Sequence, residues 1–233
     1  MSEKSIHIVF PLFDGMAALD FVAPHEAFSV VPGARITVAS LGGRNIDASG
    51  LVLSGLADLS KVEGCDVLCI PGGFGTAKAM IDEAFMRDIR RLASTAKYQT
   101  SVCTGALILG AAGLLRGKRA ATYWASRDTL QMFGAIVEKG RVVRDGNIIT
   151  GGGVTAGMDF ALAAIAEIFG QAVAEDVQLA LEYAPAPPFE TVHPDDAPAE
   201  TTERLRKFMH AGLTADRVAA EQAARRLQRS PFG

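Results

Sequence analysis

The sequence of 233 residues has little of what marks several large classes of protein. Its three cysteines are too few and too unevenly placed for a disulfide framework. No apolar run approaches the roughly 18 residues that a membrane-spanning helix needs, and the first residues lack the basic start and apolar core of a signal peptide. A formal net charge of −3 predicts no basic face for nucleic acid. We therefore expect a soluble, cytoplasmic protein that binds neither nucleic acid nor membrane.

Hydrophobic residues make up 49% of the chain and charged residues 21%, which is enough for a well-filled core. Strand-like runs alternate with helical patterns, and glycine marks most of the junctions between them. This alternation predicts an α/β domain with a doubly wound, mostly parallel, flavodoxin-like sheet. The expected strands are 5–12, 35–40, 66–70, 98–102 and 147–150, and the main expected helices are 76–81, 83–94, 104–113, 155–169 and 171–183.

Two details of this prediction depend on proline and glycine. Pro24 is comfortable only in a first helical turn, so we expect a helix to begin near it and to place Asp20 in the preceding connection or in a short turn before it. The final helical stretch, 201–227, should break near Gly212. Hairpins are expected at 45–53 and around Asp145-Gly146-Asn147.

Ligands of such sheets bind outside the carboxyl ends of the strands. Four junctions, 14–20, 71–75, 103–105 and 151–155, should therefore converge on one edge of the sheet. At the third junction a short strand stops at Cys103, and a small-residue helical pattern starts directly afterwards. A thiol on this elbow is presented clear of its neighbours, and the backbone N–H groups of the helix should lower its pKa. We interpret Cys103 as a nucleophile rather than a buried structural cysteine.

Two further side chains are candidates for the same chemistry. Asp20 is the acid best placed to meet the thiol, and a partly desolvated carboxyl there has a raised pKa and can carry protons. It is alternatively a cap at the entry of a helix. The Thr104 hydroxyl is either a hydrogen-bond partner of the reacting atom or an ordinary first-turn residue.

The glycines at the second junction admit two interpretations. Gly72 and Gly73 either point backbone N–H groups into an oxyanion-binding or substrate-binding site or form a plain tight turn. Gly151-Gly152-Gly153 indicates another close backbone approach beside the elbow. Nucleotide binding is disfavoured, because no Walker lysine and no complete dinucleotide fingerprint is present.

The positions of the histidines and of the other cysteines argue against two further kinds of site. None of the four histidines follows Cys103 closely or occupies a glycine-marked junction, so a protease-type Cys–His dyad is not supported. Cys65 and Cys69 have no cluster of ligands near them, and we interpret them as small buried hydrophobic residues rather than a metal site.

Together, Pro71-Gly72-Gly73, the Ser101 to Gly105 elbow and the Asp20 to Glu26 stretch resemble the DJ-1/PfpI superfamily of the class I glutamine amidotransferase-like fold. Cys103-Thr104 with Asp20, and the stretch Glu182-Tyr-Ala-Pro-Ala-Pro-Pro188, narrow the resemblance to the isocyanide hydratases. It runs from the first strand to Phe189 and weakens in the tail. It implies a catalytic domain over 1–190 and an extension over 191–233 that packs on the domain or on a dimer partner.

The resemblance implies hydration of an organic isocyanide to an N-substituted formamide through a covalent thioimidate, without metal or organic cofactor. Cys103 takes the place of the nucleophile, Asp20 that of the acid and Thr104 that of the adjacent hydroxyl. The implied partners are the isocyanide and water, and the implied assembly is a homodimer. Tyr123 stands where relatives often carry histidine, and Val154 where they often carry isoleucine, so both are expected near the substrate.

Two rival functions remain open within this superfamily. Glyoxalases and deglycases pair the cysteine with a glutamate and usually a histidine, a pattern that Asp20 and Thr104 argue against. Ligand-sensing domains of transcription regulators append DNA-binding helices of roughly 100 residues. The 36 residues from Pro198 to Gly233 are too few for that addition.

Overall fold

The computed structural model describes residues 5–191 and 193–229. Its main sheet has the spatial order β10-β11-β7-β6-β1-β2-β5. All neighbouring pairs are parallel except β10 and β11. The strands are β1 (Ile6–Pro11), β2 (Ala34–Ser40), β5 (Ala57–Asp58), β6 (Val67–Ile70), β7 (Tyr98–Val102), β10 (Val142–Asp145) and β11 (Ile148–Gly151). The predicted doubly wound α/β fold is confirmed.

Two small sheets and a set of helices complete the described structure. The antiparallel pair β3 (Ile46–Ala48) and β4 (Leu51–Leu53) and the hairpin β10–β11 confirm the two predicted hairpins, and β8 (Arg119–Ala120) pairs with β9 (Ile136–Val137). The helices are α1 (Ala18–Ser29), α2 (Thr76–Ile81), α3 (Glu83–Thr95), α4 (Gly105–Ala111), α5 (Arg127–Gln131), α6 (Ala156–Phe169), α7 (Gln171–Ala180), α8 (Ala199–Phe208) and α9 (His210–Arg229), with short 3₁₀ turns η1 (Leu41–Gly43), η2 (Leu59–Lys61) and η3 (Trp124–Ser126).

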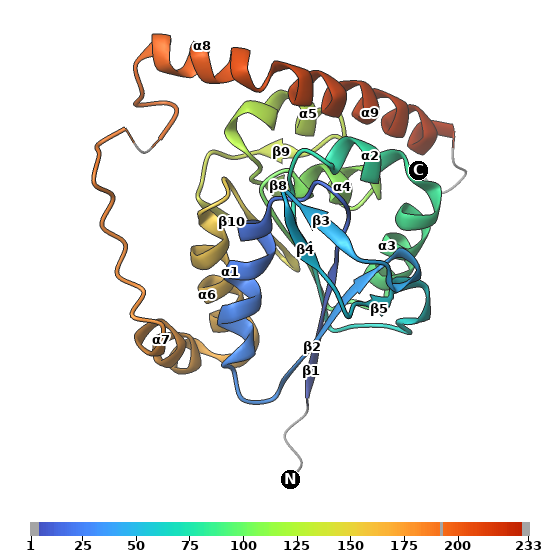
Figure 1. Cartoon of the computed structure of the whole chain (residues 1–233), viewed down its shortest axis with the longest axis vertical. Helices are drawn as coiled ribbons and strands as arrows, with labels where there is room; N and C mark the ends of the chain where they lie inside the picture. Colours follow the sequence, from blue (N-terminus) through green and yellow to red (C-terminus); the bar gives the residue numbers. More distant parts are fainter. Residues whose placement is uncertain (1–4, 192, 230–233) are drawn as a thin grey trace.

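Helices cover both faces of the main sheet, as Figure 1 shows. Helices α1 and α6 pack together on one face, with α7 against α6, and α2, α3 and α4 lie on the other. Strands β1, β6 and β7 are buried almost throughout, so the core lies between the central strands and the two helical layers. None of the described helices is long and apolar enough to cross a membrane.

Helix α1 begins earlier than predicted and contains Pro24 in its interior. The prediction that the helix begins near Pro24 is therefore wrong, and Asp20 lies inside the first turn of the helix rather than before it. Proline cannot donate the usual backbone hydrogen bond, which costs about 3 kcal/mol or more. Burial of Phe21 and Phe28 offsets this cost, and α1 packs on α6.

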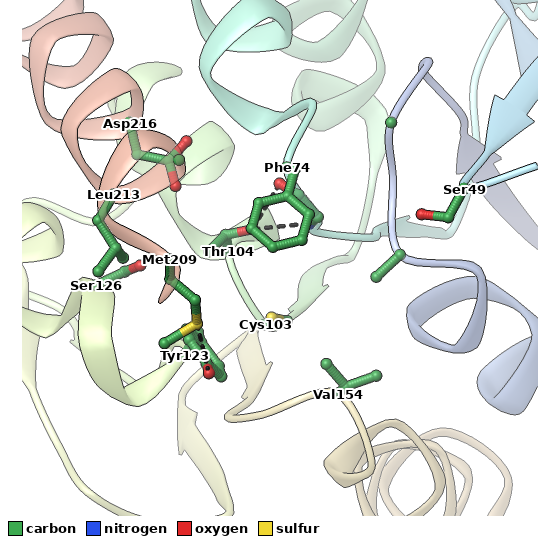
Figure 2. Close-up of a pocket in the computed structure, with 14 residues that line it drawn as sticks. Ser49, Phe74, Cys103, Thr104, Tyr123, Ser126, Val154, Met209, Leu213 and Asp216 are labelled. Carbon is green, nitrogen blue, oxygen red and sulfur yellow. Dashed lines mark hydrogen bonds between the residues drawn. The ribbon is translucent and has the colours of Figure 1, made fainter. Parts of the chain in front are cut away.

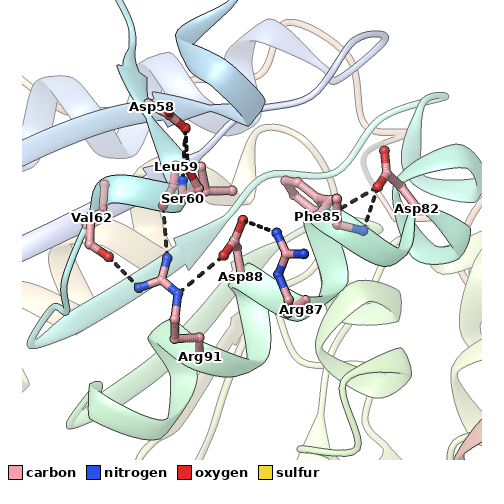
Figure 3. Close-up of polar contacts among 10 residues, drawn as sticks. Asp58, Leu59, Ser60, Val62, Asp82, Phe85, Arg87, Asp88 and Arg91 are labelled. Carbon is pink, nitrogen blue, oxygen red and sulfur yellow. Dashed lines mark hydrogen bonds and ion pairs between the residues drawn. The ribbon is translucent and has the colours of Figure 1, made fainter.

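Helix α3 is fixed at its start and along one side by polar contacts, drawn in Figure 3. Asp82 caps the helix by accepting the N–H groups of Ala84 and Phe85, each at 3.0 Å. The guanidinium of Arg91 donates to the carbonyls of Leu59 and Val62 in the loop at η2. These contacts tie the helical layer to the edge of the sheet that lies away from Cys103.

The tail forms two helices, α8 and α9, which meet at Met209 and cross the top of the molecule in Figure 1. The predicted break near Gly212 is present but lies at Met209, and Gly212 itself is inside α9. A Cβ there would come within 2.9 Å of the Phe74 ring. Gly212 is therefore explained by close packing of α9 on the loop before α2, rather than by a helix end.

Candidate active site

Cys103 follows β7 directly and precedes α4, as the elbow prediction requires. Its backbone has φ +57°, an unusual value for a residue with a side chain. Its N–H donates to Gly151 at 3.0 Å, and its carbonyl accepts the Thr122 hydroxyl at 3.0 Å. Two neighbouring segments therefore hold the strained turn in place, and the side chain is only 4% exposed.

Asp20 is fully buried and comes to Cys103 from α1. Its Oδ2 accepts the N–H of Gly72 at 2.9 Å. Its Oδ1 has no hydrogen-bond partner within residues 5–191 and 193–229. The Cys103 thiol acts on the pKa of the carboxyl as a hydrogen-bond donor. One oxygen is thus anchored by the glycine loop, and the carboxyl as a whole interacts with the thiol.

Burial raises the pKa of Asp20 from 3.8 to about 7, and the donors Gly72 and Cys103 oppose that rise. Burial, reinforced by the Asp20 carboxylate, also raises the pKa of the Cys103 thiol well above 9.0, while Thr104 acts in the opposite direction. The predicted lowering of the thiol pKa is wrong in its net direction, because burial and the Asp20 carboxylate outweigh the backbone hydrogen bond at Thr104. The two groups titrate as a pair, and moving the thiol proton to Asp20 removes the charge that opposes a thiolate.

The Thr104 hydroxyl faces the glycine loop before α2. Its Oγ1 accepts the N–H of Gly73 at 2.9 Å and lies 2.8 Å from the hydroxyl of Thr76. The N–H groups of Gly72 and Gly73 are thus engaged by Asp20 and Thr104. In this structure the loop orients the two candidate catalytic side chains, and binding of substrate by these amides stays a prediction.

Glycine is required at this loop by close backbone approaches. A Cβ on Gly72 would lie 2.5 Å from the backbone nitrogen of Thr104, and one on Gly73 would lie 2.2 Å from that of Ala17. The N–H of Ala17 donates to the carbonyl of Gly72 at 2.8 Å. The loop therefore sets the distance between α1, which carries Asp20, and the elbow, which carries Cys103.

Gly73→Ala should destabilise the protein far more than Gly50→Ala. Both residues have positive φ, +130° and +90°, but the Cβ at position 50 would meet nothing within 4 Å. We expect a loss of about 1 kcal/mol for Gly50→Ala from backbone strain and of about 3 kcal/mol or more for Gly73→Ala, where the clash adds to that strain. Urea unfolding measures both changes, and equal losses would contradict the packing argument.

A cavity of about 180 Å³ opens onto the sulfur of Cys103 and is called the Cys103 cavity here. Each of the four predicted junctions contributes to its lining, through Ala17, Gly73, Cys103 with Thr104, and Val154. The predicted convergence is therefore confirmed. Figure 2 shows the sulfur between Thr104, Tyr123 and Val154, with Phe74 above it.

Tyr123 and Val154 both line the Cys103 cavity. The Tyr123 hydroxyl donates to the sulfur of Met209 at 3.1 Å, which links the cavity wall to the end of α8. Val154 is half-buried and lies across the cavity from the tail in Figure 2. Their predicted positions near the sulfur agree with this arrangement, and their roles in specificity remain predictions.

One wall of the Cys103 cavity comes from the tail, and sequence reasoning missed it. Met209 at the junction of α8 and α9, and Gly212, Leu213 and Asp216 of α9, line the cavity, and α9 packs on α2 and α4. Their helical spacing was a usable signal, because 209, 213, 216 and 220 share one side of a helix. Asp216 was the informative residue, since it is a charged residue on that otherwise apolar side.

Other ionisable candidates lie outside the Cys103 cavity. His25 packs against the rings of Phe10 and Phe21, with centroids 6.1 and 5.1 Å apart, and Glu26 is exposed. Cys65 and Cys69 are buried free cysteines, as predicted. Across the described ranges, no group of three or more His, Cys, Asp or Glu side chains is arranged to hold a metal ion.

The sequence of this chain is similar to those of known proteins. The sequence profile of the DJ-1/PfpI family matches residues 6–167. The chain is 44% identical over 224 residues to an isonitrile hydratase of Pseudomonas putida, covering 96% of this chain and 98% of that protein.

Solved structures agree with the sequence comparison. A THiJ/PfpI family protein from Pseudomonas syringae superimposes with a TM-score of 0.89 at 38% identity, over 93% of this chain and 90% of that one. Drosophila melanogaster DJ-1beta gives a TM-score of 0.69 at 25% identity, and 78% of this chain covers all of that structure. The sequence match and the shared fold agree with the cysteine elbow described above, and the chain belongs to the DJ-1/PfpI family.

Proposed function

We propose that this protein hydrates an organic isonitrile, also called an isocyanide, to an N-substituted formamide. The observation that carries the proposal is the buried pair of Cys103 and Asp20, in which the carboxyl interacts with the thiol and Cys103 lines the Cys103 cavity. The isonitrile hydratase of Pseudomonas putida, similar over nearly its whole length, supports the choice of substrate class.

In the first step, the sulfur of Cys103 forms a bond to the terminal carbon of the isonitrile. The thiol proton passes to Asp20 and from there to the same carbon, which gives a thioimidate, R–N=CH–S–Cys103. A pKa of about 7 suits Asp20 to this exchange, because it takes up and releases a proton near neutral pH. The covalent step divides one difficult addition into two easier ones.

In the second step, water adds to the thioimidate carbon. Asp20 accepts a proton from the water and passes it to the substrate nitrogen, which leaves a tetrahedral carbon bearing N, OH and S. Collapse breaks the C–S bond, the hydroxyl proton returns through Asp20 to the sulfur, and R–NH–CHO leaves. The sum is one isonitrile and one water consumed for one formamide formed, with the Cys103 thiol and the Asp20 carboxylate restored.

The direct test is incubation of the pure protein with alkyl and aryl isonitriles, with formamide production followed by chromatography. We expect turnover of isonitriles and none of methylglyoxal, which tests the rival glyoxalase function in parallel. Turnover of methylglyoxal alone would replace the hydratase by the glyoxalase. Absence of formamide with every isonitrile would overturn the proposal.

We also propose the organisation that the family resemblance implies: a catalytic domain over 1–190, an extension over 191–233 and a homodimeric assembly. Val192 and residues 230–233 of the extension lie outside the described structure. Sedimentation at several protein concentrations tests the assembly, and a monomer at all of them would contradict it.

A further inference from the structure

Two polar side chains in the wall of the Cys103 cavity have no use in the reaction described above. Asp216 of α9 and Ser126 of η3 both line the cavity. Asp216 is 6% exposed and Ser126 is 1% exposed. The Oδ1 of Asp216 and the Oγ of Ser126 are buried and lack a hydrogen-bond partner in the part of the chain that the structure describes.

Contacts within the protein account for only part of the hydrogen-bonding capacity of these two side chains. The backbone of Ala77 at the start of α2 acts on the pKa of Asp216 as a hydrogen-bond donor, at the place where α9 packs on α2. That contact leaves Oδ1 free, while burial raises the pKa of Asp216 to about 7. An unpaired buried polar atom is costly, so two of them on residues that line one cavity indicate a partner that the described part of the chain does not supply.

Most of the other residues that line the cavity are apolar or, near the sulfur, already hydrogen-bonded. Much of its lining is apolar, from Ala17, Phe74, Val154, Met209 and Leu213. The other polar side chains nearest the sulfur are engaged, since Thr104 bonds to the glycine loop and Tyr123 to Met209. Figure 2 places Asp216 and Ser126 on the same side of the cavity, beside Leu213 and away from Val154.

We propose that Asp216 and Ser126 form a polar subsite that binds a hydroxyl group on the organic part of the isonitrile. This inference rests on the proposed function and specifies its substrate class. A carboxylate only accepts hydrogen bonds, whereas a serine hydroxyl donates one and accepts others. A substrate hydroxyl satisfies both, because it donates to Asp216 and accepts from Ser126. The apolar walls then hold the carbon chain between this hydroxyl and the isocyano group at Cys103.

The test uses two series of straight-chain isonitriles that differ only in a terminal hydroxyl or methyl group. The kcat/KM ratio of hydroxyl to methyl substrate is measured for each chain length. In the wild-type protein we expect a preference for the hydroxyl at one chain length, and a decrease of that preference by about tenfold or more in Asp216→Leu. Ser126→Ala should decrease it in the same direction.

The kcat/KM ratio of hydroxyl to methyl substrate distinguishes binding of the hydroxyl by Asp216 from a purely structural role of Asp216. If Asp216 only anchors α9, Asp216→Leu lowers kcat/KM for both series equally and the ratio is unchanged, which would overturn the subsite. Asp216→Asn, which keeps the shape and one acceptor oxygen, should recover part of the preference. Exposed Asp128 of α5 provides a control, because Asp128→Asn should leave the ratio unchanged.

Failure of the hydratase function gives a different result. In that case the wild-type protein converts neither series, and calorimetry with the corresponding N-alkyl and N-hydroxyalkyl formamides decides on the subsite. Tighter binding of the hydroxyl compounds that is lost in Asp216→Leu supports it. Equal binding of both series to the wild-type protein overturns it.

Discussion

Cys103→Ala is expected to abolish formamide production, lowering kcat/KM by at least about a thousandfold. The proposed reaction passes through a bond between this sulfur and the substrate carbon, and alanine offers no atom in its place. Alanine also leaves the backbone strain at φ +57° as it is, so the fold should survive. Steady-state kinetics with an alkyl isonitrile measures the loss, and circular dichroism checks the fold.

Cys65→Ala is the matched control for this experiment. Cys65 is also a buried free cysteine, but it is not among the residues that line the Cys103 cavity. Its replacement should leave kcat/KM unchanged within about twofold, because surface and core changes outside the site act mainly on stability. Substantial activity in Cys103→Ala, or an equal loss in Cys65→Ala, would refute a nucleophilic role of Cys103.

Asp20→Asn should lower kcat/KM by about 10²- to 10⁴-fold, the usual contribution of a positioned proton donor and acceptor. Asparagine keeps the shape and can still accept the N–H of Gly72, so the geometry of the elbow should remain. If Asp20 also activates water, the thioimidate accumulates. Mass spectrometry of the quenched variant then shows the protein with the mass of one isonitrile added at Cys103.

Stability gives an independent check on Asp20, because its pKa is raised in the folded protein from 3.8 to about 7. The corresponding stabilisation is complete below pH 3.8 and is lost as the pH rises through about 7, in an amount of about 4 kcal/mol. Asp20→Asn removes this titration. Relative to wild type, the variant should therefore gain stability between pH 4 and pH 8, as measured by urea unfolding.

The activity control for Asp20 is Glu26→Gln on the same helix. Glu26 is exposed, so this change should leave kcat/KM unchanged. Full activity in Asp20→Asn would remove Asp20 from the mechanism. Unchanged pH dependence of stability in that variant would instead contradict its burial in an ionisable form.

Local patterns predicted the fold well where hydrophobic runs and glycines agree. β7 was predicted to its exact bounds, 98–102, and so was α2, 76–81. Helix α1 was mispredicted because the cost of Pro24 is a local property, whereas its compensation comes from burial of Phe21 and Phe28 in the core, which no local rule contains.

The candidate site was also predicted in part. Cys103, Asp20 and Thr104 were found because strand ends meet at one edge of a parallel sheet. The direction of the thiol pKa was wrong, because it depends on how deeply the sulfur is enclosed and how near the carboxyl lies. The wall formed by α9 was missed, because a polar helix with a narrow apolar side does not reveal what it will cover.

The contribution of α9 has a consequence for how this enzyme family can diversify. The family profile ends at residue 167, yet the wall that faces the nucleophile lies at 209–216, while similarity to the Pseudomonas putida hydratase spans 96% of the chain. Part of the cavity lining is thus encoded beyond the family profile, whereas Phe74, Tyr123, Ser126 and Val154 lie within it. We expect chimaeras that exchange 209–216 between relatives to change substrate preference while keeping the sheet and the cysteine.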